Sequence, residues 1–149
     1  MSANPHGCSI LIVDDDRELQ DLLRVALSAD GYSVDAADNG RDAIDYLRSH
    51  AATCAILLDL MLPGMSGAQF RQIQRRDRSL AWIPVIVMSA AIDADRRARE
   101  VGADHLVPKP VDLDQLRRVI GKVAGRNCRY ARTAAAELAA GEERTLSSA

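Results

Sequence analysis

The sequence predicts an α/β protein built around a doubly wound parallel sheet, and two observations lead to this fold class. Five short runs, mostly apolar and rich in β-branched residues, alternate with segments in which apolar side chains recur at helical spacing, so the order is a fivefold strand–helix repeat. Several runs contain no alternating polar residue, which is typical of strands buried on both faces. The expected strands are residues 9–13, 33–36, 54–58, 84–88 and 105–107.

Helix boundaries are marked by residues with special backbone or capping properties. Gly31 and Gly102 follow helical stretches, where a left-handed C-cap is needed, and Asn39 and Asp112 stand where helices should begin. Pro84 is expected to open its strand, where a missing N–H is tolerated. The apolar stripes of the five helices are Leu19, Leu22, Leu23 and Ala26; Ala43, Ile44 and Leu47; Phe70, Ile73 and Gln74; Ala94, Ala98 and Val101; and Leu113, Leu116, Val119, Ile120 and Val123.

Length and charge restrict the function to a small local site. The 149 residues are enough for one domain, and 19 Lys and Arg against 21 Asp and Glu give a net charge of −2. This balance argues against a broadly basic nucleic-acid surface. No apolar run approaches the roughly 20 residues of a membrane span, and the three cysteines show no CxxC pair. We therefore expect a cytoplasmic protein with no membrane contact, no disulfide framework and no zinc site.

Polar residues follow four of the five expected strands. Asp14, Asp15 and Asp16 come after the first strand, Asp59 after the third, Ser89 after the fourth and Lys109 after the fifth. Right-handed crossovers place the carboxyl ends of parallel strands at one edge of the sheet, where ligands of open α/β sheets bind. One such Asp alone would be read as a helix N-cap, but the whole set predicts a binding site.

The chemistry of this set favours phosphoryl transfer. Two carboxylates about 4 Å apart repel by roughly 4 kcal/mol at an effective dielectric constant near 20, so the cluster needs cations. Lys109 supplies one, and Mg²⁺, which prefers oxygen ligands and leaves room for phosphate oxygens, supplies the rest. An aspartate can form an acyl phosphate. The first strand–helix turn contains no glycine, which excludes dinucleotide and P-loop sites.

Five motifs, in order along the chain, resemble the CheY-like receiver domain of bacterial response regulators. The resemblance covers residues from about 8 to 124, and the ordered set is far more specific than any one motif. The motifs are ILIVDDD at residues 10–16, DLMLPGMSG at 59–67, VIVMSA at 85–90, GAD at 102–104 and KP at 109–110.

The resemblance implies a flavodoxin-like sheet of order 2-1-3-4-5 and a set of residue roles. Asp59 would be the phosphoacceptor, Ser89 would bind the phosphoryl group through its hydroxyl, and Lys109 would pair with the phosphoryl oxygens. The Lys109–Pro110 bond would be cis. Mg²⁺ would be bound directly by Asp15, Asp59 and the Met61 carbonyl, with Asp14 holding a coordinated water, and Asp16 would be a helix N-cap.

The resemblance also implies a function in two-component signalling or a phosphorelay. The domain would take a phosphoryl group from a sensor histidine kinase or a histidine phosphotransfer domain and switch a surface that binds a downstream protein. It would be no enzyme in the ordinary sense, although it catalyses its own phosphorylation and dephosphorylation. We expect a monomer or weak homodimer without direct nucleic-acid contact. The domain would span residues 8–124, between a disordered 1–7 and an Ala-rich tail or linker stub at 125–149 without an output domain.

Three of the positions that depart from the usual family pattern bear on the expected function. Leu106 stands where the family usually has an aromatic switch residue, so we expect readout through Ser89 and the fourth helix alone. Met61 and Ala91 occupy the two positions that flank the attacking water, and neither side chain can orient or activate water. Slow loss of the phosphoryl group is therefore expected.

Two other classes of function stay open at the sequence level. A Mg²⁺-dependent phosphatase of the haloacid dehalogenase type would use Asp14 as nucleophile and Asp16 as acid. It would leave Asp59 without a role, and Glu18 stands where that class has a hydroxyl. A receiver-like scaffold that is never phosphorylated is disfavoured because every acidic, hydroxyl and lysine position is filled. The three histidines lack the spacing of metal ligands.

Overall fold

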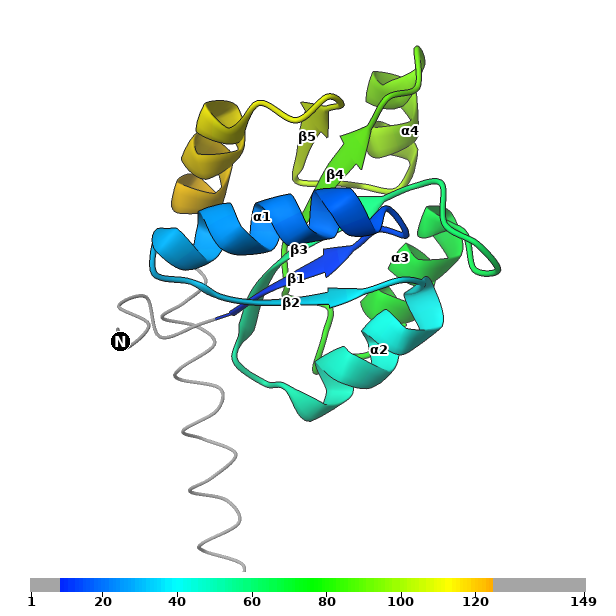
Figure 1. The fold of residues 1–149 in the computed structure, drawn as a ribbon. Helices are drawn as coiled ribbons and strands as arrows, with labels where there is room; N and C mark the ends of the chain where they lie inside the picture. Colours follow the sequence, from blue (N-terminus) through cyan, green and yellow to red (C-terminus); the bar gives the residue numbers. More distant parts are fainter. Residues whose placement is uncertain (1–8, 125–149) are drawn as a thin grey trace, which may run out of the picture.

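The fold is a five-stranded parallel sheet, shown in the computed structural model of Figure 1, which describes residues 9–124. The expectations for residues 1–7 and 125–149 lie outside this range. The strand order is β2-β1-β3-β4-β5, so the predicted doubly wound, flavodoxin-like topology is confirmed. The strands are β1 (Ser9–Val13), β2 (Ser33–Ala37), β3 (Thr53–Asp59), β4 (Val85–Ser89) and β5 (His105–Pro108).

A helix follows each strand and covers one face of the sheet (Figure 1). One face packs against α1 and a C-terminal helix described over residues 113–124, and the opposite face packs against the other three helices. The helices with printed bounds are α1 (Arg17–Ala29), α2 (Gly40–Ser49), α3 (Gly67–Arg76) and α4 (Ala94–Glu100).

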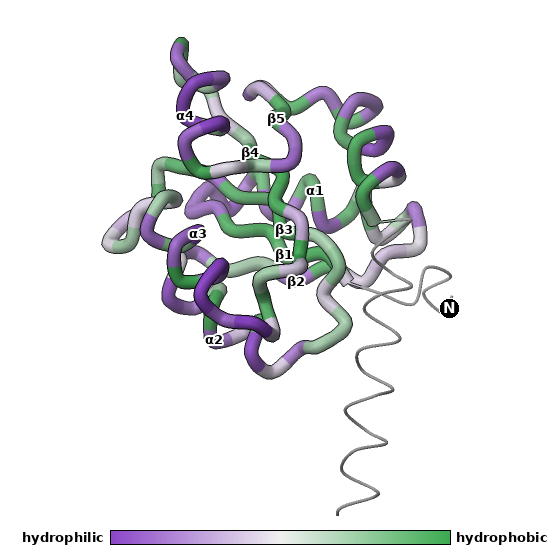
Figure 2. Tube along the Cα trace, turned by 180° about the vertical axis from the view of Figure 1, so that it is seen from behind, coloured by the Kyte–Doolittle hydropathy of each residue, from purple (hydrophilic) through white to green (hydrophobic). Residues whose placement is uncertain are grey.

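The central strand β3 is buried along its whole length, which agrees with its lack of polar alternation. Neighbouring side chains of β1 point to opposite faces: Ile10 and Ile12 join one apolar cluster, and Leu11 and Val13 join the other. The tube in Figure 2 accordingly runs green through the central strands and largely purple along the outer helices. This two-sided burial makes the sheet a rigid platform for its strand ends.

The strand register brings the predicted polar residues together. Val13 pairs with Leu58 in the β1–β3 ladder, so the next residues, Asp14 and Asp59, become neighbours at the sheet edge. Ser89 pairs with Pro108 in the β4–β5 ladder, which places Lys109 directly beyond it. The position of each side chain at the edge therefore follows from hydrogen bonding within the sheet.

The four predicted caps are present. The Asn39 side chain accepts a hydrogen bond from the Asp42 N–H at 2.8 Å, and the Asp112 side chain accepts from the Asp114 N–H at 2.9 Å. Gly31 has φ +97° and Gly102 has φ +65°, the left-handed conformation expected after a helix.

Two details of the predicted elements were wrong. Leu22 was assigned to the buried stripe of α1, but it is 51% exposed, and the stripe instead includes Gln20 and Leu27. Pro84 precedes β4 rather than opening it, although its carbonyl accepts a hydrogen bond from the Ile56 N–H. The outer strand β2 alternates in exposure because Val34 and Ala36 pack against the apolar cluster on one face of the sheet, whereas Ser33 and Asp35 point to the other face and are exposed.

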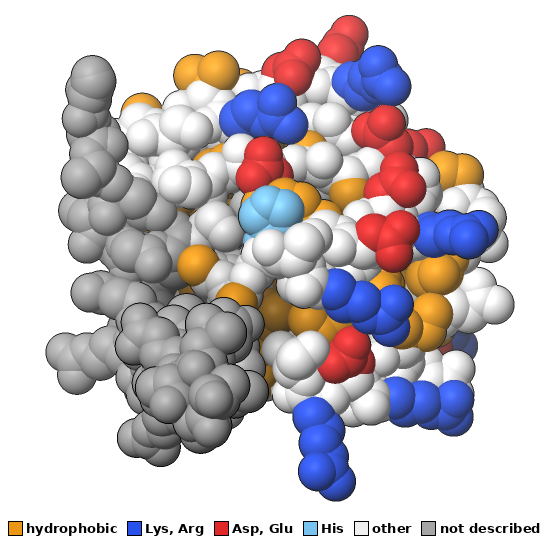
Figure 3. Space-filling view, turned by 90° about the horizontal axis from the view of Figure 1, so that it is seen from below, with side chains coloured by type: hydrophobic (Ala, Val, Ile, Leu, Met, Phe, Trp, Pro, Cys, Tyr) orange, Lys and Arg blue, Asp and Glu red, His pale blue; other side chains and the backbone are white. Residues whose placement is uncertain are grey.

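Charges of both signs are interspersed on the surface. The face in Figure 3 shows Lys and Arg side chains among Asp and Glu side chains, as expected for a chain near neutrality. In the described range, no helix combines the length and the apolar character needed to cross a membrane.

Candidate functional site

Three aspartates meet at the carboxyl ends of β1 and β3. One carboxylate oxygen from each of Asp14, Asp15 and Asp59 lies within 4.8 Å of those of the other two. Asp14 is fully buried and Asp59 is 6% exposed, whereas Asp15 lies open to solvent. Two buried carboxylates with a third at the mouth form a site that is accessible from one side and needs positive charge.

Lys109 supplies that charge by bridging the two buried carboxylates. Its ammonium nitrogen lies 2.8 Å from Asp14 Oδ2 and 3.1 Å from Asp59 Oδ2. The Lys109–Pro110 peptide is cis, as the resemblance implied, and the Lys109 N–H donates to the Ser89 carbonyl at 2.8 Å. The backbone of β4 therefore holds the lysine with its side chain directed into the acidic cluster.

The environment of Asp59 raises the pKa of its carboxyl group. Burial has the largest effect, because it penalises the charged form, and the negative charge of Asp14 acts in the same direction. The Met61 N–H, which donates to Asp59 Oδ1 at 2.9 Å, and the ammonium of Lys109 both oppose this rise. Asp59 is thus a poorly solvated carboxylate whose charged form is stabilised by two partners, the Met61 N–H and the Lys109 ammonium.

The pKa of Lys109 is also raised, although burial alone would lower it. Burial is the largest single effect, but the hydrogen bonds and charge attraction to Asp14 and Asp59 together outweigh it. The ammonium is therefore firmly protonated at neutral pH. A permanent cation stands beside Asp59.

Ser89 and Met61 lie at the rim of the cluster. The Ser89 hydroxyl is buried and accepts a hydrogen bond from the Ala91 N–H at 3.1 Å, which leaves its own proton available for donation. The Met61 side chain is 64% exposed, and its sulfur accepts a hydrogen bond from Arg97 Nη1 at 3.5 Å. The contact joins the loop after β3 to α4.

The loop between β3 and α3 is closed tightly against the site. A Cβ atom on Gly67 would lie 2.8 Å from the Leu60 Cα, so only glycine fits where the helix begins. Gly64 takes φ +77°, and Ser66 forms a capping box with Gln69. These features hold the backbone of Met61 close to Asp59.

Gln20 is a site residue that the sequence analysis missed. Its buried side-chain amide donates to the Asp14 carbonyl and, at 2.8 Å, to Asp38 Oδ1. It anchors the end of β1 to the end of β2 from α1. In the sequence, Gln20 directly follows Leu19 at the edge of the apolar stripe of α1. This position was the only indication that its side chain is buried.

The structure also places Asp16, Leu106 and His50. The Asp16 side chain accepts from the Leu19 N–H at 3.2 Å, so it caps α1 as expected. Leu106 is half-buried against the cluster that packs on α2, α3 and α4. His50 caps the C-terminus of α2, and its ring stacks on Tyr46 with centroids 3.7 Å apart.

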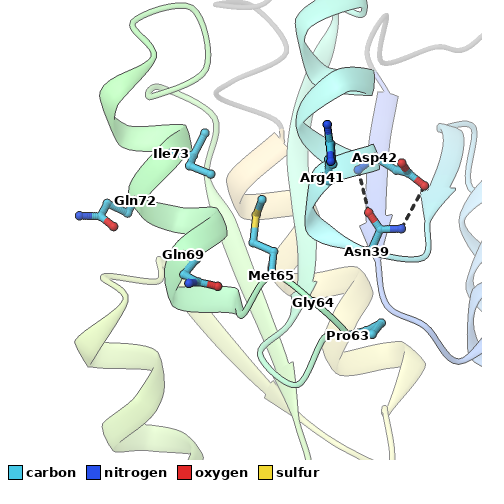
Figure 4. A pocket seen from close by; sticks show the side chains of 9 residues that line it. All are labelled: Asn39, Arg41, Asp42, Pro63, Gly64, Met65, Gln69, Gln72 and Ile73. Atoms are coloured by element: carbon cyan, nitrogen blue, oxygen red, sulfur yellow. Dashed lines mark hydrogen bonds between the residues drawn. The ribbon is translucent and has the colours of Figure 1, made fainter.

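A hollow of about 830 Å³ between α2 and α3 is lined by none of the three aspartates of the acidic cluster, Asp14, Asp15 and Asp59 (Figure 4). It shares only the loop after β3 with the site, through Pro63, Gly64 and Met65. Asn39 and Asp42, on its wall, are hydrogen-bonded to each other. The acidic cluster therefore lies outside this hollow.

The fold and the site together define a flavodoxin-like α/β protein with a lysine-bridged acidic cluster at the carboxyl ends of its strands. Residues 10–121 match the family model described as the response regulator receiver domain. The chain belongs to this family of two-component signalling domains.

Curated and solved relatives agree with this assignment. The response regulator MprA of Mycolicibacterium vanbaalenii is 38% identical over 110 residues, which cover 72% of this chain and 46% of that protein. The chain thus spans about half the length of the curated relatives it matches.

Two solved receiver domains of histidine kinases are also similar. That of sensor histidine kinase PA1611 from Pseudomonas aeruginosa PAO1, solved with a magnesium ion coordinated in its active-site cleft, has a TM-score of 0.73 and 26% identity. The match covers 80% of this chain and 98% of that one. The signal receiver domain of a signal transduction histidine kinase from Syntrophus aciditrophicus has a TM-score of 0.72 and 28% identity, over 78% of this chain and 89% of that one.

Proposed function

We propose that this receiver domain accepts a phosphoryl group on Asp59, with Mg²⁺ as cofactor, and thereby switches a surface that binds a downstream protein. The observation that carries the proposal is the buried Asp59 carboxylate, which faces Lys109 and lies within reach of two more aspartates. Phosphoryl transfer requires positioning and charge neutralisation, and this cluster is arranged for both.

The donor set fits a magnesium ion. Asp14, Asp15 and Asp59 offer hard oxygen ligands close together, and Asp15 lies at the open mouth, where a hydrated ion enters. Asp15, Asp59 and the Met61 carbonyl would hold the ion directly, with Asp14 acting through a water. Bound there, Mg²⁺ would neutralise charge on the phosphoryl oxygens. The magnesium coordinated in the PA1611 receiver domain supports this assignment by similarity.

The donor we propose is a phosphohistidine of a sensor histidine kinase or a histidine phosphotransfer domain. A carboxylate oxygen of Asp59 would form a bond to phosphorus while the phosphorus–nitrogen bond breaks, and the histidine nitrogen keeps the electron pair and takes up a proton. The product on this chain is an acyl phosphate. The domain thereby promotes its own modification.

Lys109 and Ser89 would stabilise the product. The ammonium that faces Asp59 Oδ2 at 3.1 Å would face the phosphoryl oxygens, and the Ser89 hydroxyl would donate its free proton to them. Because the Lys109 N–H is bonded to the Ser89 carbonyl, a movement of either residue shifts the ends of both β4 and β5. This coupling links Asp59 to the surface formed by α4 and β5.

Acetyl phosphate and Mg²⁺ should produce a labile adduct of one phosphoryl group on the intact protein, detected by mass spectrometry. Asp59→Asn should abolish the adduct, whereas Asp45→Asn, at an exposed position of α2, should leave it unchanged. An adduct that persists in Asp59→Asn would overturn the assignment of the acceptor. Rapid turnover of a phosphomonoester would favour the phosphatase, and no adduct in the parent protein would favour the scaffold.

Substitution of Met61 by asparagine should shorten the lifetime of the acyl phosphate by about tenfold, because the amide can orient a water that methionine cannot. The lifetime is measured by following the adduct after removal of acetyl phosphate. Met61→Leu, which keeps an apolar side chain, is the control and should decay at the parent rate. Equal lifetimes for all three proteins would show that Met61 does not limit hydrolysis.

We infer that Leu106 takes no part in an aromatic switch and that the signal leaves through Ser89 and α4. Binding of the phosphoryl analogue beryllofluoride should therefore shift methyl signals near Ser89 and amide signals of α4 more than the methyl signals of Leu106. A large rearrangement of Leu106 in the activated domain would contradict this route.

A further inference from the structure

A second polar groove lies between α3 and α4, away from the acidic cluster. Its volume is about 240 Å³, and its lining includes three arginines of α3, with Gln72 beside them and Glu100 on the α4 side. The arginines are Arg71, Arg75 and Arg76.

Arg71 forms the floor of this groove and is only 8% exposed. Its guanidinium donates to the carbonyls of Val101 and Gly102 at 3.1 and 2.9 Å, and to Gln74 Oε1 at 2.7 Å. All three acceptors are neutral, so the hydrogen bonds are satisfied while the charge lacks an anionic partner. The carbonyls at the end of α4 compensate only in part.

Arg75 adds a second guanidinium next to the first. Its Nη2 atom lies so close to Gly102 that a Cβ at that position would be 1.7 Å away, and it donates to the Gly102 carbonyl at 3.4 Å. Burial, and then repulsion from Arg75, lower the pKa of Arg71. Arg76 is exposed at the lip. The groove therefore concentrates like charge.

The nearby acids do not neutralise this charge. Among residues 9–124, no carboxylate lies within 4.0 Å of a guanidinium nitrogen of Arg71, Arg75 or Arg76. Glu100 is paired at 3.8 Å with Arg96 on its own helix. Asp104, which is close enough to influence Arg71, accepts a hydrogen bond from the Val85 N–H at 2.8 Å.

We propose that this α3–α4 groove binds an acidic segment of a partner protein through the carboxylates of its Asp or Glu side chains. Arg75 and Arg76 would pair with the carboxylates at the lip, and the fixed charge of Arg71 would strengthen the field from below. A hollow of 240 Å³ admits one or two side chains, so the segment lies across the opening. Ala68 and Val101 provide an apolar wall for the methylene groups of glutamate.

The net negative charge of the chain means that an acidic peptide would bind only at a local basic site such as this groove. At −2, the molecule as a whole repels an acidic peptide, so binding must come from a local site. The groove is also independent of the phosphorylation chemistry, because it contains no residue of the acidic cluster. A negative result here would leave the function proposed for Asp59 intact.

Titration of an oligoglutamate peptide into the isotope-labelled, unphosphorylated protein tests the groove by nuclear magnetic resonance. At low salt we expect saturable shifts of the amide signals of Arg75, Arg76 and Gly102, which diminish as ionic strength rises. The double variant Arg75→Glu, Arg76→Glu should weaken binding at least about tenfold. The matched control, Arg117→Glu with Arg118→Glu on the C-terminal helix, changes the net charge equally and should retain affinity.

Three results would overturn the proposal. The first is the absence of shifts in the groove at millimolar peptide, and the second is an equal loss of affinity in the control variant. The third is equal binding of oligothymidine or inorganic phosphate at the same residues, which would make the groove a general anion site. Circular dichroism of both double variants shows that a loss of binding is not a loss of fold.

Discussion

Replacement of Lys109 by methionine is expected to lower the free energy of unfolding near pH 7 by about 3 kcal/mol in the absence of Mg²⁺. Methionine keeps most of the aliphatic length but removes the cation that lies 2.8 Å from Asp14 and 3.1 Å from Asp59. Two buried carboxylates are then left facing each other. Urea unfolding measures the loss, and Lys122→Met, at an exposed position of the last helix, should change stability by less than about 0.5 kcal/mol.

The pH dependence of this defect follows from Asp59. A carboxyl group whose pKa is higher in the folded chain than in the unfolded chain binds an extra proton on folding, so its ionisation costs stability as pH rises through that range. The pKa of Asp59 is already raised, and removal of Lys109 raises it further. The difference in the free energy of unfolding between Lys109→Met and the parent protein should therefore shrink as the pH falls to about 4.

Magnesium should also reduce the difference in unfolding free energy between Lys109→Met and the parent protein near pH 7, because the ion replaces the missing positive charge. A defect that changes neither with pH nor with Mg²⁺ would show that Lys109 stabilises the fold by packing rather than by charge.

Arg71→Met should lower the free energy of unfolding by about 2 kcal/mol, because it strips the donor from the carbonyls of Val101 and Gly102 and from Gln74. The loss of stability should be largest at the end of α4, where Arg71 binds the carbonyls, and smaller in the sheet. The amide of Ala103, which donates to the Ala98 carbonyl at the end of α4, should exchange with deuterium faster than amides of β3.

Arg76→Met is the matched control for this variant, because Arg76 is exposed and no carboxylate of residues 9–124 lies within 4.0 Å of its guanidinium. We expect unchanged exchange at Ala103 and a change in stability below about 0.5 kcal/mol. Uniformly faster exchange across the sheet in Arg71→Met would contradict a local role for this arginine.

The topology of this domain was predictable because its central strands are buried on both faces and because glycines follow two of its helices, α1 and α4. The apolar runs of β1 and β3, which lack polar alternation, are typical of parallel strands, and the positive φ values of Gly31 and Gly102 lie where the caps were expected. The stripe of α1 was misjudged at Leu22 because spacing alone does not show how far a neighbouring helix extends over a face.

The acidic site was predictable as a set of residue types, but its contacts were not. Strand ends and register place Asp14 beside Asp59, and parallel topology alone implies this. The bridging position of Lys109 and the amide of Gln20 depend on side-chain conformations, which a sequence pattern does not encode. The burial of Arg71 was not predicted, because its sequence context does not distinguish it from the exposed arginines Arg75 and Arg76 of the same helix.

The outer strands of the sheet determine how this domain can meet other proteins. The unpaired N–H and C=O groups of an exposed edge strand can pair with a strand of another chain, which leads to aggregation. Here β2 carries the charged, exposed Asp35, and β5 has only four residues and ends in Pro108, which has no N–H to offer. Strand addition is therefore discouraged at both edges, and the surfaces left for recognition are the helices and the loops at the ends of the strands.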